Sequence, residues 1–217
     1  MDTNKLIDEL TNDLQPVKRL PSPLTRSLTW ASMALLFVAI MIYPLGGIRF
    51  NLNEALTLTS YLFENTLAFF AGLLASIAVF KLSIPDTQIH RSTILMITLS
   101  SLTWLGISLY NLAQASPESL TQAWYMHQGA VNHCLTDLLL MTFIPLGCLI
   151  YMIRKAAPIH FALAGFSSLL AISAFASIAM RILCASDDTA HLFFWHYAPI
   201  LAIAGAGIFI GRFCFRW

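Results

Sequence analysis

The chain has 217 residues, of which 58% are hydrophobic and only 11% are charged, and its formal net charge is +1. Soluble domains carry about 25% charged residues, so this composition excludes an ordinary soluble protein and predicts an integral membrane protein. No basic stripe marks a surface for nucleic acid, and we expect no direct nucleic-acid contact.

The first 26 residues, Met1 to Arg26, are the only stretch polar enough to lie in water by itself. Apolar side chains recur there at spacings of three and four, which predicts an amphipathic helix. These apolar positions are Leu6, Ile7, Leu10, Leu14 and Val17. Pro16 disfavours helical geometry at the residue before it, so the helix should run for about three turns. The following Pro21-Ser22-Pro23 predicts a stiff, non-helical spacer up to the bilayer.

Six apolar stretches follow the tail, and each is long enough to cross roughly 30 Å of hydrocarbon as a helix. They lie near Ser27 to Leu45, Thr59 to Phe80, Ser92 to Leu112, Gly129 to Ile153, Ile159 to Leu183 and Leu192 to Phe213. Their continuous apolar runs lack the alternation of a membrane barrel, so the predicted fold is an all-α, polytopic bundle. Gly207 and Gly211 predict a close helix contact within the molecule. The expected organisation is a tail, residues 1–26, and a transmembrane domain, residues 27–217.

Basic residues are distributed unevenly between the two sides of the predicted bundle. All Lys and Arg residues except Arg49 and Arg181 fall in the tail, in the second and fourth connections, or near the C-terminus. The positive-inside rule therefore places both termini in the cytoplasm. Glu64 and Asp137 are the carboxylates expected inside the apolar zone, near its outer surface, where local hydration or a partner such as Arg181 would satisfy them.

Titratable and thiol side chains gather at the predicted outer surface. His133, Cys134 and Asp137 share one helix face at the start of the fourth span. Cys184 ends the fifth span and is followed by His191. Further histidines of the same surface are His127 and His196. Both cysteines are therefore expected at one membrane surface.

Three interpretations of Cys134 and Cys184 stay open at this point. An oxidising compartment would favour a disulfide if the two Cα atoms approach within about 7 Å. Two thiolates with one or two of the histidines would instead suit a thiophilic metal ion. The third interpretation is two separately packed thiols with neighbouring interfacial histidines.

Three stretches together resemble the NrsF-like membrane anti-sigma factors, which are negative regulators of extracytoplasmic-function sigma factors in Gram-negative bacteria. They are the tail LIDELTNDLQPVKRLPSP, the fourth-span stretch HCLTDLLLMTFIPLGCLIYMIRKAAP, and the ending LCASDDTAHLFFWHYAPI with GAGIFIGRFCFRW. The resemblance implies a six-span protein of the bacterial inner membrane whose cytoplasmic N-terminal segment binds the sigma factor. It also implies that Cys134 and Cys184 correspond to the family's two characteristic outer-face cysteines.

The resulting prediction is a non-enzymatic anti-sigma factor without catalytic residues. Its sigma-binding residues would be Leu6, Ile7, Leu10, Leu14, Val17, Lys18, Arg19 and Leu20. An envelope stress signal, carried by thiol, metal or redox chemistry, would act near Cys134 and Cys184, with His133, His191 and Asp137 beside them. No cofactor is expected other than a thiophilic metal ion at the two cysteines. The expected partners are the sigma factor and the lipid bilayer.

Two other functions fit parts of the sequence. Histidines and cysteines at one surface would also suit a membrane redox enzyme or a haem protein, although no CxxC motif is present. An N-terminal helix lying on lipid, with the bundle acting as a small transporter, is the second alternative. The acidic polar face of the tail suits anionic lipid poorly.

Overall fold

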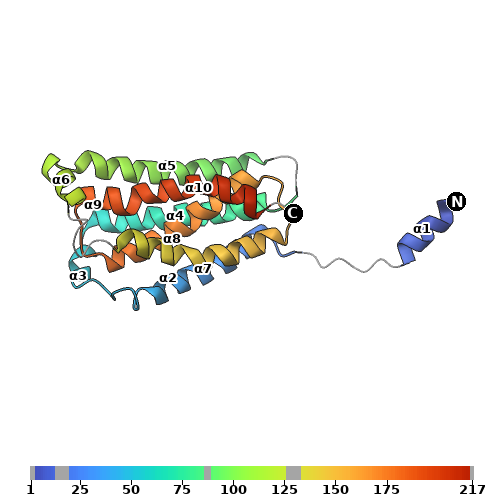
Figure 1. Ribbon diagram of the computed structural model, residues 1–217, viewed down its shortest axis with the longest axis horizontal. Coiled ribbons are helices and arrows are strands. Elements are labelled where there is room, and N and C mark those ends of the chain that lie inside the picture. The colour runs from blue at the N-terminus through green and yellow to red at the C-terminus, as the bar shows by residue number, and fades with distance from the viewer. Residues whose placement is uncertain (1–2, 13–19, 86–88, 126–132, 216–217) are drawn as a thin grey trace.

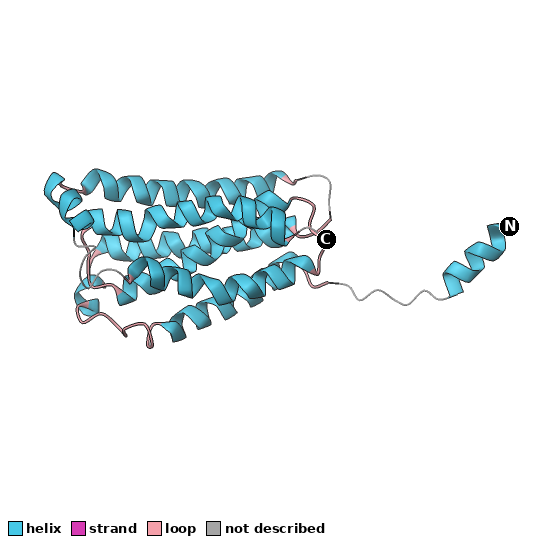
Figure 2. Cartoon of the chain, viewed as in Figure 1, coloured by secondary structure: helices cyan, strands magenta, loops and turns pink. Residues whose placement is uncertain are grey.

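The computed structural model describes residues 3–12, 20–85, 89–125 and 133–215, and within these ranges the chain is helical, with no strand (Figure 2). Six helical stretches are long and apolar enough to cross a membrane. They are α2 (Pro23–Met41), α4 (Thr59–Leu82), α5 (Arg91–Gln114), α7 (Cys134–Arg154), α8 (Phe161–Leu183) and the continuous stretch Thr189–Cys214. The predicted fold class, an all-α polytopic membrane protein with six spans, is confirmed.

The tail helix α1 spans Thr3–Asn12, and the helix end predicted from Pro16 lies outside the described residues. The first span, however, lies four residues nearer the N-terminus than expected, because α2 begins at Pro23 rather than at Ser27. The Ser22 side chain accepts a hydrogen bond from the Thr25 amide at 3.2 Å and caps the helix. Proline suits the first helical turn, where its missing amide leaves no donor unsatisfied. The expectation that Pro23 belongs to a non-helical spacer is therefore wrong.

Helix α8 occupies the centre of the bundle and packs against α10 (Ala198–Cys214), α4, α7 and α2 (Figure 1). In the most apolar stretch of α8, 72% of the residues are buried inside the bundle. A Cβ atom on Gly165 would collide with backbone atoms of Gly207 and Gly211. The pair Gly207 and Gly211 thus serves close packing within the molecule, as predicted.

The bundle has two distinct ends (Figure 1). At the end that we call the cysteine end, α7 begins and α8 stops. The short helices α3 (Leu52–Ala55) and α6 (Pro117–Tyr125) lie in the connections there, and α9 (Thr189–Leu192) opens the last span. At the opposite end, which we call the tail end, α2 begins and the C-terminal helix finishes. The helix α1 stands apart from the bundle beyond the tail end.

Candidate functional site

The cysteine end brings the two predicted cysteines into contact. Cys134 is the first residue of α7 and Cys184 directly follows α8. Since α7 starts where α8 stops, the two Sγ atoms lie 3.9 Å apart. Both thiols are free, because a disulfide needs an S–S distance of about 2.05 Å. The expectation that both cysteines reach one surface is confirmed.

His191 completes a triangle with the two thiols. Its Nε2 atom lies 3.3 Å from Cys184 Sγ and 3.8 Å from Cys134 Sγ. The one-turn helix α9 holds this side chain in place, because the Asp188 carboxylate caps it by accepting a hydrogen bond from the His191 amide at 2.8 Å. Asp188 therefore positions His191 through the backbone.

A π-helical turn, η2 (Phe193–Tyr197), adds a second histidine to the cluster. In a regular α-helix, residues five apart point about 140° away from each other. The wider i→i+5 turn brings His196 beside His191, with 5.3 Å between the ring centroids. One ligand atom of each of Cys134, Cys184, His191 and His196 lies within 4.8 Å of the others.

The four side chains of the cluster are largely buried, and their contacts shift the pKa of one of the two thiols. Cys134, His191 and His196 are buried, and Cys184 is partly buried. The hydrogen bond donated by Cys134 lowers the pKa of Cys184 far below that of an ordinary thiol. The imidazoles of His191 and His196 add to this effect, which outweighs the opposing effect of burial. A thiolate at Cys184 is a nucleophile and a metal ligand.

Two arginines connect the loops around the cluster to the helices. Arg49 donates hydrogen bonds to the Asp187 carboxylate and, at 3.1 Å, to the carbonyl oxygen of Cys184. Arg181 pairs with the same carboxylate at 3.1 Å. Burial opposes ionisation of Asp187, but the hydrogen bond from Arg49 and the charges of both arginines lower the pKa of its carboxyl. The backbone of Cys184 is thus fixed by an ion-pair network.

The same network extends into the bundle through Glu64. Its carboxylate lies 3.6 Å from Arg181 and accepts hydrogen bonds from Tyr197 at 2.7 Å and from Asn111 at 2.9 Å. The structure therefore supplies the partner that the sequence suggested for this intramembrane acid. Tyr197 also ends the π-helical turn that carries His196, so Glu64 helps to hold that turn.

A cavity of about 470 Å³ leads to the cluster from the cysteine end. Cys134, Cys184 and His191 line it, together with His133 and Asp137. The exposed His133 and the half-buried Asp137 lie at the wall of the cavity, outside the group of four ligand atoms. Of the five predicted sensor residues, the structure brings three into contact. It adds His196, which the sequence analysis named among the histidines of this surface but not among the predicted sensor residues.

The predicted sigma-binding residues are only partly described. Leu6, Ile7 and Leu20 are exposed. The side chain of Leu10, and the residues Leu14, Val17, Lys18 and Arg19, lie outside the described part of the chain. His127, a further histidine considered for the cysteine end, also lies outside it.

Comparison with known proteins decides the family. Residues 10–217 match the family described as NrsF, negative regulator of sigma F. The chain belongs to the NrsF family. No curated protein and no solved structure matches it. As an NrsF protein it is a non-enzymatic negative regulator, its partner is a sigma factor, and its six apolar helices make it a multi-pass membrane protein. The redox-enzyme alternative is therefore excluded.

Proposed function

We propose that residues 1–26 of this NrsF protein hold an extracytoplasmic-function sigma factor at the cytoplasmic face of the bacterial inner membrane. Residues 27–217 anchor the tail and carry the sensor of envelope stress. The observation that supports the tail as the binding element is α1, an amphipathic helix that stands apart from the bundle (Figure 1). Its apolar side chains Leu6 and Ile7 are 38% and 51% exposed, and a partner would cover them.

The binding energy of such a tail is limited. Burying Leu6, Ile7, Leu10 and Leu14 stabilises a complex by about 1.5 to 3 kcal/mol each. Ordering the tail on its partner subtracts about 2 to 5 kcal/mol. Confinement of both proteins to one membrane surface raises their effective concentration, and this strengthens a binding that the tail alone makes only modest. Tight sequestration thus depends on the anchor as well as on the tail.

Release of the sigma factor is proposed to follow from chemistry at Cys134 and Cys184. Cys134 begins α7, and the far end of α7 lies beside α2, which continues the tail. Arg26 of α2 donates a hydrogen bond to the carbonyl oxygen of Met152 at 2.5 Å, and the Trp30 indole donates one to the carbonyl of Pro145 at 3.0 Å. Pro145 lies inside α7, where proline kinks a helix. Displacement of Cys134 would therefore move acceptors that hold α2.

Single acidic substitutions on the apolar face of α1 test the binding element in the full-length protein. Leu6→Asp or Ile7→Asp should weaken capture of the sigma factor by more than about tenfold, because each loses at least about 1.5 kcal/mol of apolar burial. The measurement is co-purification of the sigma factor, beside expression of a reporter gene that it transcribes. Lys5→Asp places the same acid on the opposite face and should leave both unchanged. Equal capture by all three variants and the unmodified protein would contradict the proposal.

The sensor is tested in the same reporter strain. A double variant, Cys134→Ser with Cys184→Ser, should keep basal repression and lose induction by thiol-reactive agents, because no thiolate remains in the cluster. Cys148→Ser serves as the matched control, since this cysteine is exposed on α7 away from the cluster. Normal induction of the double variant would place the sensor elsewhere.

A further inference from the structure

We propose that Cys134, Cys184, His191 and His196 together form a tetrahedral binding site for one Zn²⁺ ion. The inference deepens the proposed function, on which its regulatory meaning rests, by naming the ligand set and the ion of the sensor. In a tetrahedral zinc site, bonds of about 2.3 Å to sulfur and about 2.0 Å to nitrogen separate two sulfurs by about 3.8 Å and a sulfur from a nitrogen by about 3.5 Å. The observed separations are 3.9 Å between the sulfurs, and 3.8 and 3.3 Å from His191 Nε2 to them.

His196 provides the second, independent observation. It is completely buried, and neither of its ring nitrogens has a hydrogen-bond partner within the described residues. Burying an imidazole without a partner costs free energy, so such groups are uncommon in folded proteins. Coordination of an ion would give one of the two ring nitrogens a partner and so lower this cost. The π-helical turn points to the same conclusion, because such turns frequently occur at functional sites.

The surrounding charges favour a divalent ion. Arg49 and Arg181 pair with Asp187 and Glu64, so these four side chains balance one another. Two thiolates at the edge of the bilayer would add two uncompensated negative charges, which are costly to bury. One divalent cation neutralises them, whereas Cu⁺ would leave one negative charge. Hard cations such as Mg²⁺ and Ca²⁺ prefer oxygen ligands, so the two sulfurs and two nitrogens select zinc.

The cavity at the cysteine end gives the zinc ion a route into and out of the site. The cavity reaches Cys134, Cys184 and His191 directly, and His196 is not among its lining residues. Any proton that the two cysteines still carry passes to water when their bonds to zinc form. Four protein ligands leave no open position for a catalytic water, in keeping with a non-enzymatic regulator. A thiol-modifying agent or a more thiophilic ion entering by the cavity would displace zinc and free α7 from α9 and η2.

Metal binding by the purified full-length protein in detergent micelles tests the site. The protein is reduced, stripped with a chelator and titrated with Zn²⁺ against a chromophoric competitor, and parallel samples receive Co²⁺ or Cu⁺. We expect one Zn²⁺ per chain, and Co²⁺ should give the visible ligand-field bands of tetrahedral thiolate coordination. Cys184→Ser and His196→Gln should each weaken Zn²⁺ binding by more than about tenfold. His90→Gln and Cys148→Ser, which lie outside both the ligand group and its cavity, should bind as the unmodified protein does.

Several results would overturn the site. They are a stoichiometry well below one, a Co²⁺ spectrum unchanged by His196→Gln, or equal losses in ligand and control variants. If a ligand variant misfolds, alkylation of the unmodified protein decides instead: Zn²⁺ should protect Cys134 and Cys184, and unprotected thiols would refute the proposal. The Leu6→Asp variant should bind Zn²⁺ normally. Loss of sigma binding and loss of zinc binding are therefore separate outcomes.

Discussion

Buried arginines lie at both ends of the bundle, but they have different kinds of partner. At the cysteine end, Arg49 and Arg181 pair with the carboxylates of Asp187 and Glu64. At the tail end, Arg26 has only neutral acceptors among the described residues: the Ser83 hydroxyl at 3.0 Å and the Met152 carbonyl at 2.5 Å. Its guanidinium also lies 4.8 Å from the centre of the Phe80 ring. The arginines at the cysteine end are therefore held by charge pairs, whereas Arg26 at the tail end is held by neutral acceptors that it can exchange for others.

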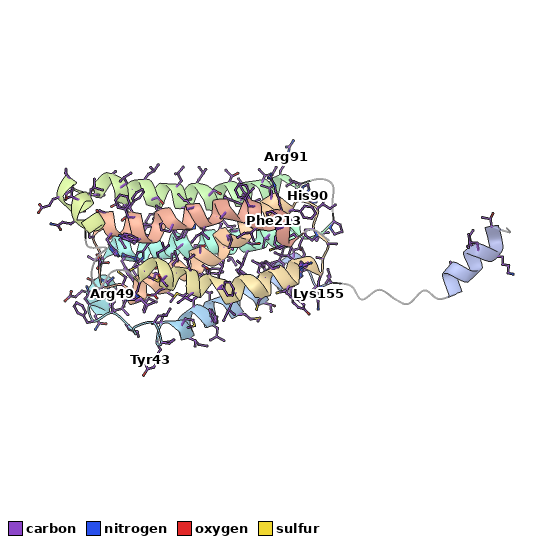
Figure 3. The ribbon with its side chains drawn as sticks, viewed as in Figure 1. Tyr43, Arg49, His90, Arg91, Lys155 and Phe213 are labelled. Carbon is purple, nitrogen blue, oxygen red and sulfur yellow. The ribbon has the colours of Figure 1, made fainter. Side chains whose placement is uncertain are left out.

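The two ends differ in the free energy that separation would cost, because an arginine that moves leaves a charged partner at one end and a neutral partner at the other. A buried carboxylate that loses its arginine remains as an uncompensated charge, so the network at the cysteine end resists separation. A carbonyl or hydroxyl that loses Arg26 remains neutral. The guanidinium, at the end of a long side chain near the membrane surface, can turn to lipid headgroups or water instead. Arg49 at the cysteine end and Lys155 at the tail end mark these two regions in Figure 3.

The largest effect is expected from breaking the network at the cysteine end. Glu64→Leu should lower the free energy of unfolding by about 3 to 5 kcal/mol, because Arg181, Tyr197 and Asn111 lose their shared acceptor inside the bundle. The measurement is denaturant unfolding in detergent micelles, followed by circular dichroism. Glu118→Gln, an exposed carboxylate on α6, should change the free energy of unfolding by less than about 0.5 kcal/mol. Equal stabilities of the two variants would mean that the cysteine end is not locked by charge.

A smaller loss of stability, with a larger effect on regulation, is expected at the tail end. Arg26→Gln should cost about 1.5 to 3 kcal/mol, the value of hydrogen bonds from a charged donor, and should raise basal reporter expression because α2 is no longer tied to α7. Arg91→Gln is the control, since Arg91 is exposed at the same end (Figure 3). If Arg91→Gln raised expression as much as Arg26→Gln, the contact with Met152 would have no part in release.

Much of the bundle could be predicted from hydropathy because the membrane permits few alternatives. The number of spans and the common surface of Cys134 and Cys184 follow from counting apolar stretches and alternating their direction. The cost of an isolated charge in lipid suggested Arg181, beside local hydration, as the means of satisfying Glu64, and the structure contains that pair. These are properties of composition and order along the chain, which the sequence contains directly.

The remaining features depend on backbone detail that periodicity does not reveal. His196 was considered as a metal ligand but was left out of the predicted sensor residues. Periodicity could not place it beside His191, because a regular helix would point the two apart and only the π-helical turn brings them together. Likewise, the start of α2 was misplaced because Ser22 and Pro23 form a helix cap rather than a spacer. The pair of Arg49 and Asp187 could not be predicted either, because it depends on how two loops that are distant in the sequence fold against each other.

The π-helical turn has a further consequence for the whole last span. If the π-helical turn Phe193–Tyr197 became a regular α-helix with no residue removed, everything after it would rotate by about 100° relative to α9. Gly207 and Gly211 would then turn away from Gly165, against which they now pack without room for a Cβ atom. The extra residue therefore sets two registers at once, the histidine pair before it and the glycine contact after it. Loss of the π turn would therefore break the histidine pair and the glycine contact together, so the segment is constrained in backbone geometry as well as in composition.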